Sequence, residues 1–250
     1  MIRTPLDDGV PKEPTAVQYW LQYSVSGKHM SETTRNTLQV DIVSDVVCPW
    51  CIIGYKQLQK ALTLLSDPPV IKLRWHPFEL NPAMPEEGQD LREHLAQKYG
   101  ISPEQSAATR TRMTELGDAL GFEFDYFDGM RMVNTFRAHQ LLHWAEEAGC
   151  QTPLKLALFK AFFSDRQDVN DTAVLCAAAE NVGLSSQQAA AVLEEQRFAA
   201  VVRKEQQQWL DRAVHAVPNF VFNGTYQVPG AQEADTFVRV IEKIHSRDVA

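Results

Sequence analysis

The chain has 250 residues, of which 44% are hydrophobic, and it carries a formal net charge of -8. Its length and apolar content predict a globular protein with a sizeable core, while the acidic balance argues against nucleic acid and anionic lipid as partners. No stretch approaches the roughly 20 apolar residues of a membrane span. Four cysteines, at positions 48, 51, 150 and 176, are too few for a disulfide-stapled secreted scaffold.

Residues 1–36 contain several prolines and charges but no sustained periodicity, so they are predicted to form a disordered N-terminal extension. The later "MSETTRN" has the character of an ordinary polar N-terminus, which suggests Met30 as an alternative start. The apolar run "AVQYWLQYSVSG" is interrupted by Gln18, Gln22 and Ser24, unlike the core of a signal peptide. We therefore expect a cytoplasmic protein.

A strand, a helix and a second strand are predicted to follow. The run "LQVDIVSDVV" (38–47) is rich in β-branched residues, and Pro49 then suits the first turn of a helix that continues through "CIIGYKQLQKALTLL" (51–65). After Pro68 and Pro69, "VIKLRWHPFEL" (70–80) predicts another strand. This order implies two parallel strands joined by a right-handed crossover.

The middle of the chain, residues 90–212, is predicted to be helical throughout. Ser102 and Gln105 form a capping box, and amphipathic stretches recur up to Arg212. Sheet patterning returns in "VPNFVFNGTYQVPG" (217–230), where Asn223 and Gly224 predict a two-residue hairpin turn, and "EADTFVRVIEKIHS" predicts a final helix. The helical block is therefore expected to interrupt one sheet.

The chemically informative stretch is "CPWC", in which Pro49 and Trp50 separate Cys48 from Cys51 at the predicted strand-to-helix junction. Amide hydrogens and the dipole at a helix N-terminus stabilise a thiolate, so we expect the pKa of Cys48 to be lowered. We also expect Cys48 to be exposed and Cys51, one turn further, to be shielded. Cys48 would then attack a client disulfide, and Cys51 would resolve the mixed disulfide.

Other interpretations of the cysteines remain open. The pair could be half of a zinc site, with His139 and His143 as distant complements, although no second CxxC occurs; simple core packing is a further alternative. We predict no metal site and expect the two histidines to lie in the helical core or at its rim. Cys150 and Cys176 are predicted to be buried small hydrophobic residues rather than a second redox pair.

Three segments together carry a family resemblance: "CPWC" (48–51), "WHPFELNP" (75–82) and "VPNFVFNG" (217–224). With the helical block, they resemble the DsbA-like branch of the thioredoxin superfamily, above all its FrnE-type members, over residues 38–246. The resemblance implies an α/β fold in which residues 37–89 and 213–250 form a thioredoxin-like domain and residues 90–212 form a large inserted all-helical domain.

The resemblance also implies a cis bond before Pro218, which would turn the backbone of Val217 toward Cys48 to pair with an extended client. Pro49 and Trp50 would complete the substrate-binding site, and we expect Phe78 at its apolar rim. The implied activity is thiol-disulfide exchange with protein clients or small thiols, without a cofactor, although glutathione is a plausible thiol substrate. The Pro-Trp dipeptide differs from that of thioredoxin and of the periplasmic oxidase, so neither reduction potential is transferable.

Two alternative functions follow from the same residues. The superfamily also includes glutathione-dependent transferases of the kappa type and hydroxychromene-carboxylate isomerases, which resemble this chain except that a serine replaces the first cysteine. A zinc-binding or chaperone-like module is the non-enzymatic alternative. Because Cys48 is retained, we favour a disulfide oxidoreductase.

Overall fold

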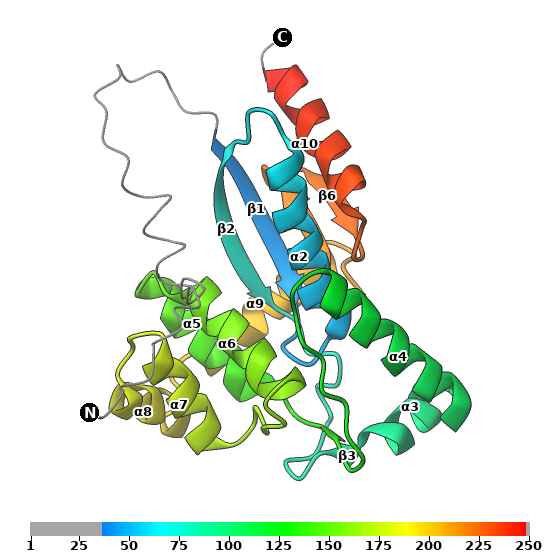
Figure 1. Cartoon of the computed structure of the whole chain (residues 1–250). Helices are drawn as coiled ribbons and strands as arrows, with labels where there is room; N and C mark the ends of the chain where they lie inside the picture. The colour runs from blue at the N-terminus through cyan, green and yellow to red at the C-terminus, as the bar shows by residue number, and fades with distance from the viewer. Residues whose placement is uncertain (1–36, 249–250) are drawn as a thin grey trace, which may run out of the picture. The chain divides into compact units, whose positions relative to one another are not determined.

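The structure is a computed structural model, and it describes residues 37–248 (Figure 1). The predicted N-terminal extension and the alternative start at Met30 lie outside these residues. The elements in chain order are β1 (Thr37–Ser44), α2 (Pro49–Leu64), β2 (Val70–Pro77), β3 (Gln89–Asp90), α3 (Leu91–Tyr99), α4 (Pro103–Ala119), β4 (Arg131–Met132), α5 (Phe136–Glu147), α6 (Gln151–Phe163), α7 (Thr172–Asn181), α8 (Ser186–Glu194), α9 (Ala199–Asp211), β5 (Asn219–Phe222), β6 (Tyr226–Pro229) and α10 (Ala234–Asp248).

In the described part of the chain, the main sheet has four strands in the order β2-β1-β5-β6. Strand β1 pairs parallel with β2 on one side and antiparallel with β5 on the other, and β5 and β6 form a hairpin. Helix α2 makes the crossover between the two parallel strands. The predicted order of strands and helices around the sheet is confirmed, and the fold is a thioredoxin-like α/β fold with a large helical insertion.

The two faces of the sheet are covered by different parts of the chain. Helices α2 and α10 lie side by side over one face (Figure 1), and Val40 and Ile42 of β1 are fully buried in the core on that side. On the other face, Val43 of β1 and Val221 of β5 pack with Trp209 of α9. Since successive residues of a strand point to opposite faces, burial on both sides explains the nearly unbroken apolar run of β1.

The insertion differs from the prediction in one detail. It is not all-helical, because Gln89 and Asp90 of β3 pair antiparallel with Met132 and Arg131 of β4 in a short ladder. Sequence patterning misses such two-residue strands because they have no room for an alternating pattern. The boundaries of the insertion as a separate domain stay a prediction.

The predicted hairpin turn is present, but the register lengthens its loop. Asn223 and Gly224 have φ of 47° and 67°, the left-handed region that asparagine and glycine adopt most readily. Thr225 N–H donates to Phe222 O at 3.0 Å, and Phe222 pairs with Tyr226. The loop therefore holds three residues rather than two.

Among residues 37–248, no helix is long and apolar enough to cross a membrane.

Candidate active site

Cys48 and Cys51 lie at the junction predicted for them. Strand β1 ends at Ser44, and after a short turn Cys48 is the N-cap of α2, with Pro49 in the first turn. Proline fits there because its missing N–H would have no helical partner and its fixed φ suits a helix. Cys51 N–H donates to Cys48 O at 3.0 Å, which places the two cysteines within one turn.

The Cys48 thiol is more enclosed than the sequence suggested. Cys51 is 0% exposed, as expected, but Cys48 is only 3% exposed, so the expectation of an exposed first cysteine is wrong. Tyr126, which follows α4 and is distant in sequence, is close enough for the Cys48 charge to raise its pKa further, after burial has raised it. The neighbouring Trp50 is 37% exposed and marks where the site meets solvent.

The two thiols titrate as a pair, and the first anion forms on the inner sulfur. A hydrogen bond with Cys51, together with burial, raises the pKa of Cys48 well above its ordinary value. Burial also raises the pKa of Cys51, but hydrogen bonds with the side chains of Cys48 and Ser44, together with the charge of Lys155, outweigh it, so the pKa of Cys51 is lowered. The expected lowering at Cys48 is therefore wrong for the dithiol, because Cys48 acts as the hydrogen-bond donor.

Val217 and Pro218 lie opposite the dithiol, on the segment that leads into β5. The Val217–Pro218 peptide bond is cis, and Gly230 N–H donates to Pro218 O at 2.8 Å. The Cys48 thiol donates to Val217 O with an S···O distance of 3.7 Å. The fold thus brings together residues that are separated by 169 positions in the sequence.

A buried carboxylate lies beneath the cysteine loop. Asp45 is 0% exposed; its Oδ2 accepts from Leu80 N–H at 2.7 Å, and its Oδ1 lies 3.3 Å from His139 Nε2. His139 Nε2 also lies 3.1 Å from Phe78 O. Burial raises the pKa of Asp45, but the hydrogen bond and charge of His139 and the Leu80 N–H lower it more, so its pKa lies below the ordinary value.

A lysine from the insertion reaches the interior side of the dithiol. Lys155 of α6 is 0% exposed, and its Nζ donates to Ser44 O at 3.4 Å. The Nζ also lies 5.4 Å from the ring centroid of Trp75 and 5.0 Å from that of Phe159. Burial lowers the pKa of Lys155 to about 8, although the charges of Cys51, Asp45 and Cys48 favour its protonated form.

Asp45 and Lys155 were not identified from the sequence. Asp45 lies within the predicted strand 38–47, and Lys155 within the apolar "LKLALFKAFF", where a lysine on a helix normally reaches solvent. The only available signal was a charged residue inside each of two strongly apolar runs. Local patterning cannot show that the two meet near the same pair of sulfurs.

Three other residues considered from the sequence, one phenylalanine and two histidines, lie away from an open site. Phe78 is 9% exposed and packs with Val43, Trp209, Val214 and Val221 rather than lining an open rim. His139 is buried, as expected. His143 packs against Phe198 with tilted rings, and its Nδ1 lies 3.6 Å from Glu205 Oε2.

Cys150 and Cys176 are both free thiols. Cys176 is buried at 8% exposed, as predicted, whereas Cys150 is only half-buried because it caps the exposed start of α6. Among residues 37–248, no group of three or more histidine, cysteine, aspartate or glutamate side chains has an arrangement that could hold a metal ion.

The fold and the dithiol define the class: this is a thioredoxin-fold protein with a CxxC pair at the start of a helix. The DSBA-like thioredoxin domain model matches residues 39–242, so the chain belongs to the DsbA-like thioredoxin family. The "Uncharacterized protein YwbO" of Bacillus subtilis is 26% identical over 206 residues, covering 82% of this chain and 96% of that protein.

Solved structures agree with this assignment. The "probable DsbA oxidoreductase SCO1869" from Streptomyces coelicolor superposes with a TM-score of 0.78 at 31% identity, covering 82% of this chain and 89% of that one. The "cytosolic disulfide reductase DsbM" from Pseudomonas aeruginosa superposes with a TM-score of 0.57 at 15% identity, covering 85% and 100%, which shows a shared fold alone.

Proposed function

We propose that the protein is a thiol-disulfide oxidoreductase in which Cys48 attacks and Cys51 resolves. The observation that carries this proposal is the position of the Cys48 thiol, at the N-cap of α2 and 3.7 Å from Val217 O. The Cys51 N–H at the helix N-terminus favours the Cys48 anion, although the Cys51 side chain and burial outweigh it in the free dithiol. A main-chain carbonyl beside that sulfur is a group with which an extended client can pair.

The reaction consists of two exchanges. The Cys48 thiolate attacks one sulfur of a client disulfide, the client S–S bond breaks, and one client sulfur leaves as a thiolate. The Cys51 thiolate then attacks Cys48 Sγ, forming the Cys48–Cys51 disulfide and releasing the second client thiolate. The client gains two electrons and the dithiol loses them. The reverse sequence donates a disulfide, and the direction depends on the reduction potentials of the partners.

Client binding must also open the site, since Cys48 is only 3% exposed. The Cys48 thiol occupies Val217 O, which a client N–H would take in a strand-like pairing. When a client N–H takes Val217 O, the Cys48 thiol loses one of its two hydrogen-bond acceptors, and Cys51 is the other. Pro49 and Trp50, at the exposed edge of the site, together with Val217 and Pro218, form the proposed contact surface.

A glutathione-dependent isomerase or transferase is the alternative enzyme class. Its members resemble this chain in fold but have a serine where Cys48 stands, so retention of both sulfurs favours exchange chemistry. We propose protein disulfides or small disulfides such as that of glutathione as substrates, with no resident cofactor. The proposed location is the cytoplasm, where reduction or isomerisation of disulfides is easier to sustain than net oxidation.

A trapping experiment tests the proposal. Cys51→Ser should accumulate mixed disulfides through Cys48 in cells under oxidative stress, whereas the matched Cys48→Ser, Cys51→Ser double variant should accumulate none. Both variants should carry Cys150→Ser, because that thiol is half-buried and can react on its own. No trapped species in Cys51→Ser, or a catalytic activity on small aromatics that survives in the double variant, would reject the proposal.

A further inference from the structure

Lys155 is an unexpected residue to find fully buried next to two thiols. Lysines are almost never fully buried unless a charge partner compensates them, because removing an ammonium group from water is unfavourable. The polar contact of the Nζ is weak, at 3.4 Å to Ser44 O. The charge partners that favour its protonated form are Cys51 first, then Asp45 and Cys48.

Asp45 already has other partners. The Leu80 N–H donates to Asp45 Oδ2 at 2.7 Å, and His139 Nε2 lies 3.3 Å from Oδ1. Cys51, by contrast, is stabilised as an anion by hydrogen bonds from the Cys48 thiol and the Ser44 hydroxyl and then by the charge of Lys155, against the unfavourable effect of burial. The charge of Lys155 therefore matters most to the inner sulfur.

In the resolving step, the Cys51 thiolate depends more strongly on the charge of Lys155 than it does in the free dithiol. Once Cys48 is joined to a client, it has no S–H to donate, so the hydrogen bond that lowers the pKa of Cys51 in the dithiol is lost. The Ser44 hydroxyl and the charge of Lys155 remain, and Lys155 is the charged group of the two. Cys51 must nevertheless lose its proton to solvent and attack from a position that is 0% exposed.

We propose that Lys155 is a positioning residue of the resolving step, in which its buried ammonium group holds Cys51 as the thiolate that attacks the mixed disulfide. This inference rests on the proposed exchange function. In this step the Cys51–Cys48 bond forms, the Cys48–client bond breaks, and the client sulfur takes the electron pair. Helix α6 thus makes the insertion part of the thiol chemistry.

Other titratable groups surround the lysine and must be considered in a pH profile. Cys48 at the N-cap of α2, Cys51 within α2 and Asp45 in the loop after β1 are close enough for their charges to act on it. A small cavity that Lys155 helps to line also includes His76 from β2, His139 and His143 from α5, and Glu205 from α9. The side chains of His143 and Glu205 are 18% and 12% exposed, so both can exchange protons with solvent and contribute to the profile.

A two-phase disulfide assay separates the two steps. The reduced protein, with Cys150→Ser and Cys176→Ala, is mixed with Ellman's reagent, an aromatic disulfide; attack by Cys48 releases one coloured thiolate and resolution by Cys51 releases the second. Lys155→Met, which keeps side-chain length without the charge, should affect the first phase less than the second, because Cys48 interacts with the lysine charge less strongly than Cys51 does. It should slow the second about 3- to 10-fold at pH 7, since each unit of pKa rise reduces thiolate tenfold but raises nucleophilicity about threefold.

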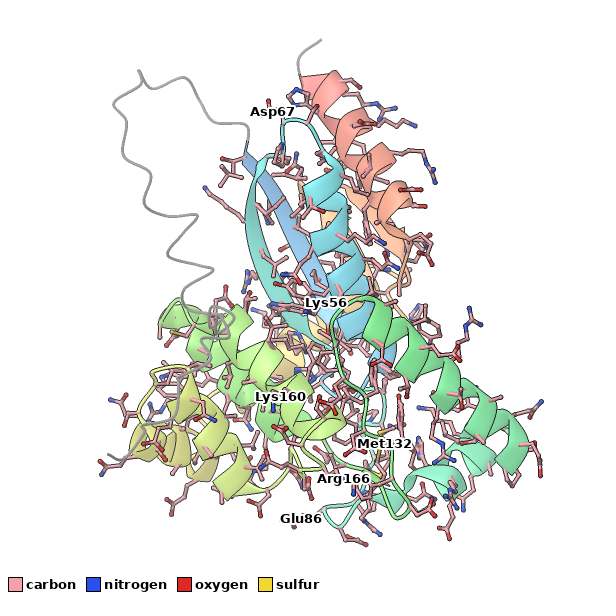
Figure 2. All side chains as sticks on the ribbon, in the orientation of Figure 1. Lys56, Asp67, Glu86, Met132, Lys160 and Arg166 are labelled. Carbon is pink, nitrogen blue, oxygen red and sulfur yellow. The ribbon has the colours of Figure 1, made fainter. Side chains whose placement is uncertain are left out.

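The pH profile distinguishes charge from packing. The Lys155→Met defect should disappear at high pH, where Cys51 ionises without help, whereas a defect of equal size at every pH would indicate a purely structural role and overturn the inference. The matched control is Lys160→Met on the same helix (Figure 2). The side chain of Lys160 is 63% exposed, so this substitution should not affect either phase.

The two proposals fail in different ways. An unaltered second phase in Lys155→Met rejects the role of the lysine and leaves the exchange function standing. Absence of the first phase in the unmodified dithiol rejects the exchange function itself. A second readout is the ultraviolet titration of Cys51 in a Cys48→Ala form, where Lys155→Met should move thiolate formation to higher pH; no movement contradicts the inference.

Discussion

His76 Nδ1 on strand β2 lies 2.6 Å from Glu205 Oε1 on helix α9, which joins the sheet to the insertion. The other imidazole nitrogen lies 2.8 Å from Asp41 Oδ1 on β1. Burial lowers the pKa of His76, but the two carboxylates outweigh it and raise the pKa. Burial likewise raises the pKa of Glu205, but His143, His76 and Arg74 lower it to about 2.

These opposite shifts predict a pH window for the stabilising effect of Glu205. A histidine whose pKa is raised in the folded state contributes its full stabilisation below the pKa of the unfolded chain, about 6.5. This contribution is lost as the pH rises through the pKa of the folded state. A glutamate whose pKa is lowered in the folded state contributes its full stabilisation above the pKa of the unfolded chain, about 4.3. This contribution is lost as the pH falls toward 2. We expect Glu205→Gln to destabilise the protein by about 2–3 kcal/mol near pH 5.5 and by less near pH 9. Urea unfolding at both values measures the difference.

The matched control for this prediction is Glu195→Gln. Glu195 pairs with Arg197 at 2.8 Å, but its side chain is 57% exposed, so the change should be under about 1 kcal/mol at any pH. A Glu205→Gln effect that is the same at pH 5.5 and pH 9 would show that His76 does not change its protonation state between these two pH values, which contradicts the predicted window.

Gln151 supports another contact between the insertion and the sheet. Strand β2 is at the sheet edge, and Gln151 Oε1 accepts from Trp75 N–H at 2.8 Å while its Nε2 donates to Trp75 O at 2.9 Å. Gln151→Met leaves the buried N–H and C=O of Trp75 without their hydrogen-bond partners, so it should lower the free energy of unfolding by about 3 kcal/mol. Gln187→Met, at an exposed position of α8, is the control; equal effects in denaturant unfolding would contradict the prediction.

The parts of the fold that sequence patterning predicted are those specified locally. Alternation and β-branched residues mark β1, Pro49 marks the start of α2, and Asn223 with Gly224 marks the hairpin. Each signal acts within a few residues, so a single sequence contains it. The placement of Cys48 and Cys51 followed from these signals.

The electrostatics of the site depend on contacts that local patterning cannot show. Lys155 and Cys51 are about one hundred residues apart, and the burial of Cys48 depends on groups such as Val217 that come from distant segments. A helix N-terminus alone predicts a lowered pKa for its first sulfur. A second thiol and a buried lysine together move the first anion to the inner sulfur instead.

Gly54 of helix α2 lies close to the Phe220 ring of β5 and to the backbone of Ala231. A Cβ at this position would lie 3.0 Å from Phe220 Cζ and 3.3 Å from the Ala231 Cα, so the ring and this backbone would have to shift by a few tenths of an ångström. We expect Gly54→Ala to destabilise the protein by about 1–2 kcal/mol, despite the better helix propensity of alanine. Lys60→Ala, exposed on the same helix, should be nearly neutral in the same unfolding assay, and a stabilised Gly54→Ala would contradict this account.

Asp45 should oppose ionisation of Cys48. After the hydrogen bond with Cys51 and burial, the Asp45 charge further raises the pKa of Cys48. In a Cys51→Ser background that also carries Cys150→Ser, Asp45→Asn should therefore move alkylation of Cys48 by iodoacetamide to lower pH. Asp67→Asn, on the loop between α2 and β2 (Figure 2), is the control and should leave the profile unchanged. A shift to higher pH would mean that Asp45 acts chiefly by holding Lys155 protonated, since the carboxylate also favours the ammonium form.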